Sequence, residues 1–298
     1  MTYDPSFNPP SQVSQSLRIA SYNVHGCLGM DGKLSPARIA RVIARYNPDA
    51  IVLQELDAGC KRSDEVHQAE AIAKILQMNF HFHPSYCFNG HYGNAILSRH
   101  PMRLIKVGSL PQLYQQQHYE PRGALWVELK LQGSSVHLIN THLSLWPQER
   151  LIQIESLLGP DWLGNILCKN PVILAGDFNS SPTSRVYKRI TSKLYDTQLL
   201  LESHQPYGTW LRSYSFTRID HVFVSSDMRV NRVMVPNTEL DRMASDHFPL
   251  FVDLQVNGNG PSGFLGKQDS DRAPQNNSDH QLNNNRICNR PESSGASV

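Results

Sequence analysis

Apolar residues recur in short runs between residues 17 and 256, and turn-forming residues separate the runs. The runs are rich in Val, Ile and Leu and are bounded by Gly, Pro, Asn or Asp, as β-strands are. Several are apolar throughout, which is typical of strands that are covered on both faces. The strands predicted in this way are 17–23, 49–56, 93–98, 123–131, 135–143, 171–177, 219–225 and 248–256.

Three segments between these strands place their apolar residues at helical spacing instead. Residues 35–47 read SPARIARVIARYN, where Ser35 is suited to cap a helix and Pro36 to begin its first turn. Segments 64–79 and 147–158 have similar patterns. The link between the fourth and fifth predicted strands is too short for a parallel crossover, so part of the sheet structure must be antiparallel. The pattern therefore predicts a mixed α/β domain.

Composition changes at both ends of the chain. Residues 1–16 are polar and rich in Pro, Ser and Gln, which predicts a flexible N-terminal lead. Residues 257–298 are rich in Asn, Ser, Gly and Pro and contain few apolar side chains, so we expect a disordered low-complexity tail. One domain, spanning residues 17–256, is expected between them.

Net charge, cysteine content and the lack of targeting segments exclude only some classes of protein. The 298 residues carry a net charge of +2, which neither requires nor excludes a nucleic-acid substrate. Five scattered cysteines without a CxxC pair fit neither a disulfide framework nor a zinc site, and they suit a reducing compartment. We see no signal peptide, no transmembrane segment and no evident obligate protein partner, so the sequence predicts a cytoplasmic location.

Polar side chains stand where the apolar runs end. In ILAGDFNSSP (173–182), Asp177 and Asn179 lie two positions apart, so an extended backbone would point both toward the same face. A simple turn is the alternative interpretation, because Gly, Asp, Asn, Ser and Pro all favour turns. The other candidate groups beside predicted strands are Asn23, Glu55, His142, Asp220, Asp246 and His247.

Buried carboxylates beside apolar strands need partners, because an isolated buried charge is costly. A shared divalent cation together with a substrate phosphate would satisfy several of them at once. Carboxylate and carboxamide oxygens suit Mg²⁺ or Mn²⁺, whereas the lack of a Cys/His cluster argues against zinc. The sequence therefore indicates a metal-assisted phosphate site.

Seven motifs in this order, SYNVHG, QEL, GNAILSRHP, NTHLS, GDFNSSP, RIDHVFVS and SDHFPLFVDL, carry a family resemblance. The chain resembles the endonuclease/exonuclease/phosphatase (deoxyribonuclease I-like) superfamily over residues 17–256. The resemblance implies an α/β fold: a four-layer α/β/β/α sandwich of two mixed β-sheets with outer helices. It also implies a Mg²⁺-dependent cleft at one edge of the sandwich.

The same resemblance implies roles for the candidate residues. Asp177 would orient or deprotonate the attacking water, and Asn179 would donate to a phosphoryl oxygen. Asp220 would hold His247 against the phosphate, and His142 would assist the leaving group. The remaining expectations are Glu55, Asn23 and Asp246 at the metal, and Arg122 and Asn94 as substrate-binding residues, with Arg122 as a phosphate clamp.

The expected function is a Mg²⁺-dependent phosphodiesterase that uses in-line attack of water, with nuclease activity as one form of it. A phosphomonoesterase and a sphingomyelinase-like lipid phosphodiesterase are alternatives. A catalytically silent protein-binding module is an alternative from another class, and it predicts the loss of acidic or His motif residues that are all present here. Segments 80–93, 108–122 and 204–217 are expected to be the loops that select the substrate.

Overall fold

The computed structural model describes residues 15–87, 89–113, 120–169, 171–212 and 215–256. The predicted tail of residues 257–298 lies outside them, as does all of the predicted lead except Gln15 and Ser16, which belong to the first strand. In the part of the chain that is described, no helix is long and apolar enough to cross a membrane.

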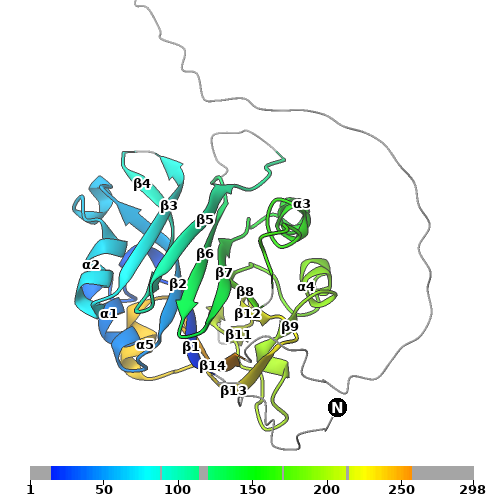
Figure 1. Ribbon diagram of the computed structural model, residues 1–298. Helices are drawn as coiled ribbons and strands as arrows, with labels where there is room; N and C mark the ends of the chain where they lie inside the picture. The colour runs from blue at the N-terminus through cyan, green and yellow to red at the C-terminus, as the bar shows by residue number, and fades with distance from the viewer. Residues whose placement is uncertain (1–14, 88, 114–119, 170, 213–214, 257–298) are drawn as a thin grey trace, which may run out of the picture. The chain divides into compact units, whose positions relative to one another are not determined.

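Two six-stranded β-sheets form the centre of the fold (Figure 1). The first sheet has the strand order β13-β14-β1-β2-β4-β3. Its strands are β1 (Gln15–Asn23), β2 (Ala50–Ala58), β3 (Asn79–Cys87), β4 (His91–Ser98), β13 (Met228–Met234) and β14 (Leu250–Val256). Only β1 and β2 are parallel among the paired strands of this sheet in the described chain.

The second sheet has the order β5-β6-β7-β8-β12-β9. Its strands are β5 (Met102–Ser109), β6 (Gly123–Leu131), β7 (Ser134–His142), β8 (Val172–Asp177), β9 (Tyr195–Asp196) and β12 (Asp220–Val224). Here β7 and β8 are the parallel pair, and the other described pairs are antiparallel. A separate short hairpin consists of β10 (Trp210–Arg212) and β11 (Ser215–Thr217).

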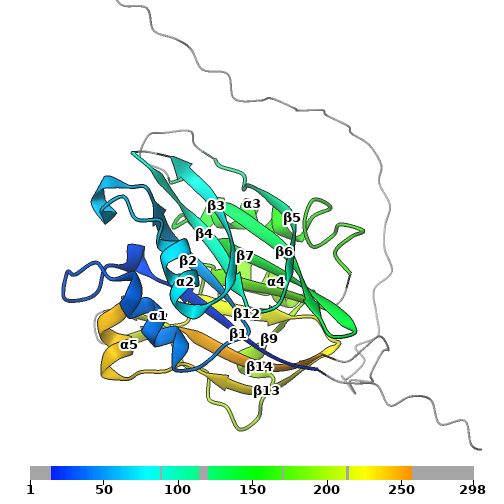
Figure 2. The same ribbon diagram turned by 60° about the vertical axis from the view of Figure 1, so that its left-hand side comes forward.

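Helices cover the outer face of each sheet (Figures 1 and 2). On the first sheet lie α1 (Pro36–Ala44), α2 (Gln68–Leu76) and α5 (Glu239–Ala244); on the second lie α3 (Pro147–Leu158) and α4 (Arg185–Thr191). One hydrophobic cluster fills the space between the two sheets. A second cluster packs the first sheet against its helices, and a third packs the second sheet against α3 and α4. This arrangement confirms the predicted four-layer sandwich.

Strand β6 shows how the sequence pattern produces these layers. Leu125, Val127 and Leu129 alternate along the strand and enter the core between the sheets. Ala124 and Trp126 point the other way and pack in the cluster beneath α3 and α4. The alternation thus predicted one buried face correctly, while the opposite face is also buried over most of the strand.

Two of the three predicted helices begin where the sequence indicates. Ser35 caps α1, since its hydroxyl accepts a hydrogen bond from the backbone N–H of Arg38, and α3 begins at Pro147. The prediction for 64–79 was wrong at its start, because α2 begins at Gln68. The cause is local: Asp64 and Glu65 have φ values of 54° and 58°, in the left-handed region that interrupts a helix.

The predicted substrate loops contain more regular structure than expected. Segment 80–93 forms most of β3 and the beginning of β4. Pro84 fits there because β3 is at the edge of its sheet, where a missing N–H is tolerated. Segment 204–217 contains β10 and β11, and the middle of segment 108–122 lies outside the described residues.

Candidate active site

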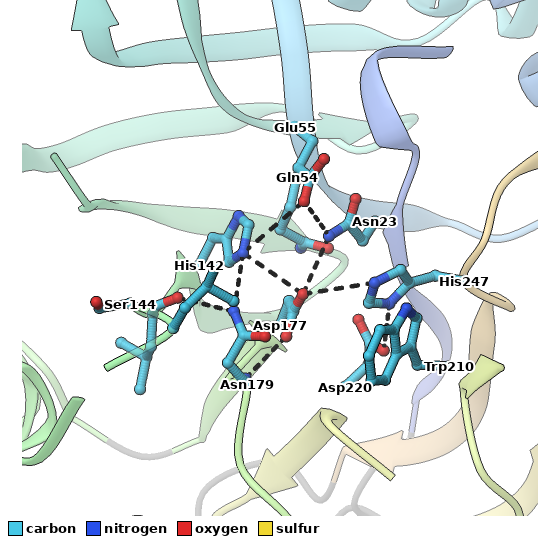
Figure 3. A network of polar contacts seen from close by, with 12 residues as sticks. Asn23, Gln54, Glu55, His142, Ser144, Asp177, Asn179, Trp210, Asp220 and His247 are labelled. Carbon is cyan, nitrogen blue, oxygen red and sulfur yellow. Dashed lines mark hydrogen bonds and ion pairs between the residues drawn. The ribbon is translucent and has the colours of Figure 1, made fainter. Parts of the chain in front are cut away.

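The topology brings the predicted site residues to one edge of the sandwich. The parallel pairing of β1 with β2 stops there at Asn23 and Gln54, beside Glu55, and the parallel pair β7 and β8 ends there with His142 and Asp177. The antiparallel strand β12 begins at the same edge, because Asp220 pairs with Asp177. Parallel strands place their carboxyl ends together, so residues far apart in sequence converge at this edge (Figure 3).

Asp177 lies at the centre of this group (Figure 3) and is 1% exposed. Its Oδ2 accepts a hydrogen bond of 3.0 Å from the side-chain amide of Asn23, and its Oδ1 accepts one of 2.8 Å from the backbone N–H of Asn179. Asn179 has a φ of 48°, so the chain turns sharply after the strand. The turn and the site are therefore the same feature: the turn brings the Asn179 amide back beside Asp177.

Asp220 and His247 form a buried hydrogen-bonded pair on one side of Asp177. The two atoms His247 Nδ1 and Asp220 Oδ2 are 2.8 Å apart, and His247 Nε2 lies 3.8 Å from Asp177 Oδ2. Thr209 also donates its hydroxyl to Asp220 Oδ2 at 2.6 Å. Asp220 thereby fixes the orientation of the imidazole and directs its Nε2 toward Asp177.

His142 lies on the other side of Asp177 and is buried. Its Nε2 is 3.5 Å from Asp177 Oδ2 and 3.1 Å from the side-chain nitrogen of Asn179. Its Nδ1 lies 3.0 Å from Nη1 of Arg122, which immediately precedes β6. Arg122 is itself buried, and its other terminal nitrogen forms an ion pair of 3.2 Å with Glu120.

Glu55 approaches from the first sheet through an irregularity in β2. The register between β2 and β4 shifts between Leu53 and Leu56, and Glu55 has a φ of 62°. Such an irregularity within a strand redirects a side chain. Glu55 Oε1 accepts a hydrogen bond of 2.8 Å from the Asn23 amide, so two of the three predicted metal-binding residues lie together.

Asp246 lies at the periphery of the same group. Its carboxylate is 3.5 Å from His25 Nδ1, and the Trp210 indole N–H donates to it at 3.4 Å. His25 also lies 3.8 Å from Glu55 Oε2, so it connects the two acidic side chains. Asn94 lies apart from this network: its amide donates to the backbone carbonyl of Gly123, and no bond joins it to another candidate within the described chain.

The pKa values of the two buried groups at the centre, Asp177 and His247, are both raised, but the consequences for their charge differ. Burial, followed by the nearby charge of Asp220, raises the pKa of Asp177 to about 7, although His247 opposes the rise. Burial alone would lower the pKa of His247, but the charge and hydrogen bond of Asp220, with Asp177 and Asp246, raise it to about 10. His247 is therefore an imidazolium near neutral pH, whereas Asp177 exchanges a proton easily.

His142 has the reverse behaviour. Burial, the positive charge of Arg122 and that of His247 together hold its pKa well below the usual value for histidine. The ring is therefore neutral at physiological pH. The site thus contains one charged and one neutral imidazole, on opposite sides of the same aspartate.

The donor set fits a divalent cation. Glu55, His142 and Asp177 each place a potential ligand atom within 4.8 Å of the others, and Asp177, Asp220 and His247 form a second such group. Asp220 Oδ1 has no hydrogen-bond partner among the described residues. In the second group His247 is protonated and bonded to Asp220, so the carboxylates of the first group, beside the Asn23 amide, are the better match for a hard cation.

Some residues of this network were missed from the sequence. Thr209 and Trp210 were placed only within a broad substrate segment, although they contact Asp220 and Asp246 directly. The backbones of Trp210 and His247 form an isolated antiparallel bridge, which no local pattern indicates. His25 follows Asn23 so closely that the motif SYNVHG was a usable signal for it.

Comparison with known proteins gives a consistent result. The model of the endonuclease/exonuclease/phosphatase family matches residues 20–247. The uncharacterized protein YbhP of Escherichia coli K12 is 22% identical over 260 residues, covering 83% of this chain and all of YbhP.

Solved structures show the same fold. An endonuclease/exonuclease/phosphatase protein from Beutenbergia cavernae superposes with a TM-score of 0.65 at 24% identity, covering 81% of this chain and 72% of that one. The human nocturnin catalytic domain, solved with a bound sulfate anion, superposes with a TM-score of 0.62 at 23% identity, covering 80% and 94%.

Proposed function

The chain belongs to the endonuclease/exonuclease/phosphatase family of phosphoester hydrolases, and from this premise we propose that it is a divalent-cation-dependent phosphodiesterase. Mg²⁺ is the proposed cation and Mn²⁺ its closest substitute. The reaction is the hydrolysis of a phosphodiester by in-line attack of water. A nucleic-acid phosphodiester is one substrate of this class.

One observation carries the proposal: a buried aspartate lies between a charged and a neutral imidazole at the edge where both sheets end. Asp177 Oδ2 is 3.8 Å from Nε2 of His247 and 3.5 Å from Nε2 of His142. Water attack on a phosphoester requires a proton acceptor and donors for the phosphoryl oxygens. This arrangement supplies both within one small volume.

Asp177 is the proposed base. Its pKa of about 7 suits a group that orients a water molecule and accepts its proton near neutral pH. The hydrogen bonds from Asn23 and Asn179 fix both carboxylate oxygens, so the water is presented with a defined direction. Preorganisation of this kind lowers the barrier because the site need not rearrange during the reaction.

His247 and Asn179 are the proposed donors to the phosphoryl oxygens. The imidazolium of His247 carries a full positive charge, which Asp220 maintains through its hydrogen bond and charge. The Asn179 amide lies beside His142 and is held by the carbonyl of Leu143. Both groups would stabilise negative charge that increases in the transition state.

Glu55, Asn23 and Asp246 are the proposed residues that hold the cation. When bound, it would neutralise charge on the phosphate and polarise it toward attack. Four carboxylates gather in this region, those of Glu55, Asp177, Asp220 and Asp246, and they favour a cation there. The tetrahedral sulfate in human nocturnin is a phosphate-like anion bound by a protein of this fold, which supports an oxyanion substrate.

The test uses the full chain and compares its hydrolysis of a phosphodiester with its hydrolysis of the matching phosphomonoester. We expect Mg²⁺-dependent hydrolysis of bis(p-nitrophenyl) phosphate that is abolished by EDTA, and much slower release from p-nitrophenyl phosphate. Faster turnover of the monoester would replace the proposal with a phosphomonoesterase. No metal-dependent hydrolysis of either ester, or of DNA, RNA and sphingomyelin, would favour the silent binding module.

A further inference from the structure

We propose that Arg122 is a positioning residue, which holds the neutral ring of His142 in the tautomer that carries its proton on Nε2. His142 then presents a hydrogen-bond donor to a phosphoryl or leaving oxygen and is not a metal ligand. The catalytic part of this inference rests on the proposed function, whereas the tautomer itself does not.

The guanidinium of Arg122 contacts the ring of His142 directly. Arg122 is 5% exposed, its Nη1 lies 3.0 Å from His142 Nδ1, and its Nη2 pairs with Glu120. An arginine side chain offers only donors and stays protonated in proteins. His142 Nδ1 must therefore accept this hydrogen bond, and a neutral imidazole that accepts at Nδ1 carries its hydrogen on Nε2.

The contact with Asn179 is consistent with this assignment. The Asn179 side-chain nitrogen lies 3.1 Å from His142 Nε2 but also 2.9 Å from the carbonyl oxygen of Leu143. A neutral ring cannot accept hydrogen bonds at both nitrogens, so only one of its two nitrogen neighbours donates to it. The Asn179 amide donates to the Leu143 carbonyl, so it does not need the ring as an acceptor. The Nη1 of Arg122 donates to the ring at Nδ1.

The free Nε2–H is then directed into the site. Asp177 Oδ2 lies 3.5 Å from it and Glu55 Oε1 lies 4.0 Å from it, and both distances are longer than that of a good hydrogen bond. An oxygen of a bound phosphoester would provide a better acceptor in the same region. His142 thus has a donor available for the substrate before the substrate binds.

The same contact excludes His142 from the cation site, although its spacing from Glu55 and Asp177 would allow coordination. A metal-binding imidazole offers a lone pair to the metal and donates its other N–H to an acceptor. The Nδ1 partner of His142 is a donor, so this requirement is not met. His247 has the opposite partner, a carboxylate, which shows that the two histidines are held in different states.

This role differs from the phosphate clamp that the sequence suggested for Arg122. Both terminal nitrogens already contact protein groups, and the side chain is buried. A clamp would require Arg122 to leave Glu120 or His142. Its present contacts instead stabilise one tautomer of a neighbouring ring.

The test is ¹⁵N NMR of the histidine rings in the full chain, with His142 assigned by the loss of its signals in His142→Gln. We expect a protonated Nε2 and an unprotonated Nδ1, unchanged when Mg²⁺ is added. Arg122→Met should release the ring to a mixture of tautomers, and Arg122→Lys should restore the Nε2–H form at least partly. Arg103→Met, which removes a distant guanidinium that pairs with Glu128, is the matched control.

Activity provides a second readout. Loss of one oriented donor should lower kcat of Arg122→Met by about 10- to 100-fold with little change in KM. The inference is overturned if wild-type His142 is protonated on Nδ1. It is also overturned if Mg²⁺ shifts the Nε2 signal in the way expected for a nitrogen that binds the metal. If the tautomer is as expected but no phosphoester is hydrolysed, the proposed function fails while the role of Arg122 in fixing the ring stands. The wild-type spectrum decides the tautomer even if Arg122→Met does not fold.

Discussion

Asp177 and His247 show how one buried environment produces two different protonation states. Burial disfavours the charged form of both side chains, yet only His247 has a directly bonded counter-charge, in Asp220. Asp177 instead faces a second carboxylate, so its pKa rises to about 7. An acceptor that is easily deprotonated therefore lies beside a donor that remains protonated.

This difference predicts a pH dependence of cation binding. Below pH 7 the metal-free protein holds a proton on Asp177, and a nearby cation favours the deprotonated form. Binding must then release that proton, so Mg²⁺ affinity should be lower at pH 6 than at pH 8. Calorimetry in buffers of different ionisation enthalpy measures the released proton. Equal affinities at both pH values, with no proton released at pH 6, would contradict the link.

At the scale of elements, the parallel strands β7 and β8 must approach very closely just before His142 and Asp177. Gly176 pairs with Thr141 and has a φ of 146°, a conformation that only glycine adopts readily. A Cβ at this position would lie 1.9 Å from the carbonyl oxygen of Thr141. The glycine therefore sets the spacing between His142 and Asp177, the residues that follow in each strand.

Gly176→Ala should for this reason reduce both stability and activity. We expect a loss of about 3 kcal/mol in the free energy of unfolding, from backbone strain and the displaced strand, and a large fall in kcat. Urea denaturation and diester hydrolysis measure the two effects. Gly133→Ala is the matched control, since Gly133 has a φ of +79° but open space where an alanine Cβ would lie. Equal effects of the two variants would show that the close approach is unimportant.

At the scale of the molecule, a buried asparagine joins the two sheets beside the site. Asn140 in β7 donates to the carbonyls of Leu53 and Ala95 in the first sheet, at 2.9 and 2.8 Å. Its own carbonyl accepts a hydrogen bond of 2.8 Å from Gln54, which precedes Glu55. This polar bridge fixes how the two halves of the candidate site face each other.

Asn140→Leu should destabilise the domain by about 2–4 kcal/mol, because it leaves buried carbonyls without donors. Asn231→Leu on the exposed surface of β13 is the control for the same change of side chain. Chemical denaturation gives both free energies of unfolding. If Asn140→Leu is as stable as Asn231→Leu, the bridge does not hold the sheets together.

Much of this architecture could be predicted from the sequence. The strand pattern predicted most of the central strands, and the motifs around Asp177, Asp220 and His247 indicated which strand ends would meet. Local backbone conformation set the limits: nothing in the residue pattern revealed the left-handed Asp64 that delays α2 or Pro84 within an edge strand. Turn and strand preferences overlap too strongly at such positions.

Contacts between distant segments were the other limit. Arg122 was recognised as a candidate, but its partner depends on how β6 pairs with β7, and hence on the folded sheet. Thr209 and Trp210 reach the site through a backbone bridge to His247, which no periodicity encodes. Sequence therefore indicated most of the groups that gather at this edge, whereas their protonation states and partners required the three-dimensional arrangement.

The most direct measurement is the kcat of Asp177→Asn for bis(p-nitrophenyl) phosphate with saturating Mg²⁺. Replacing the carboxylate by an amide of the same shape removes the proposed base, so kcat should fall by about 10²–10⁴. Asp161→Asn, whose side chain is 78% exposed, should match the wild type. If Asp177→Asn hydrolyses the diester at a rate close to that of the wild type, Asp177 is not the base and the account of this site is wrong.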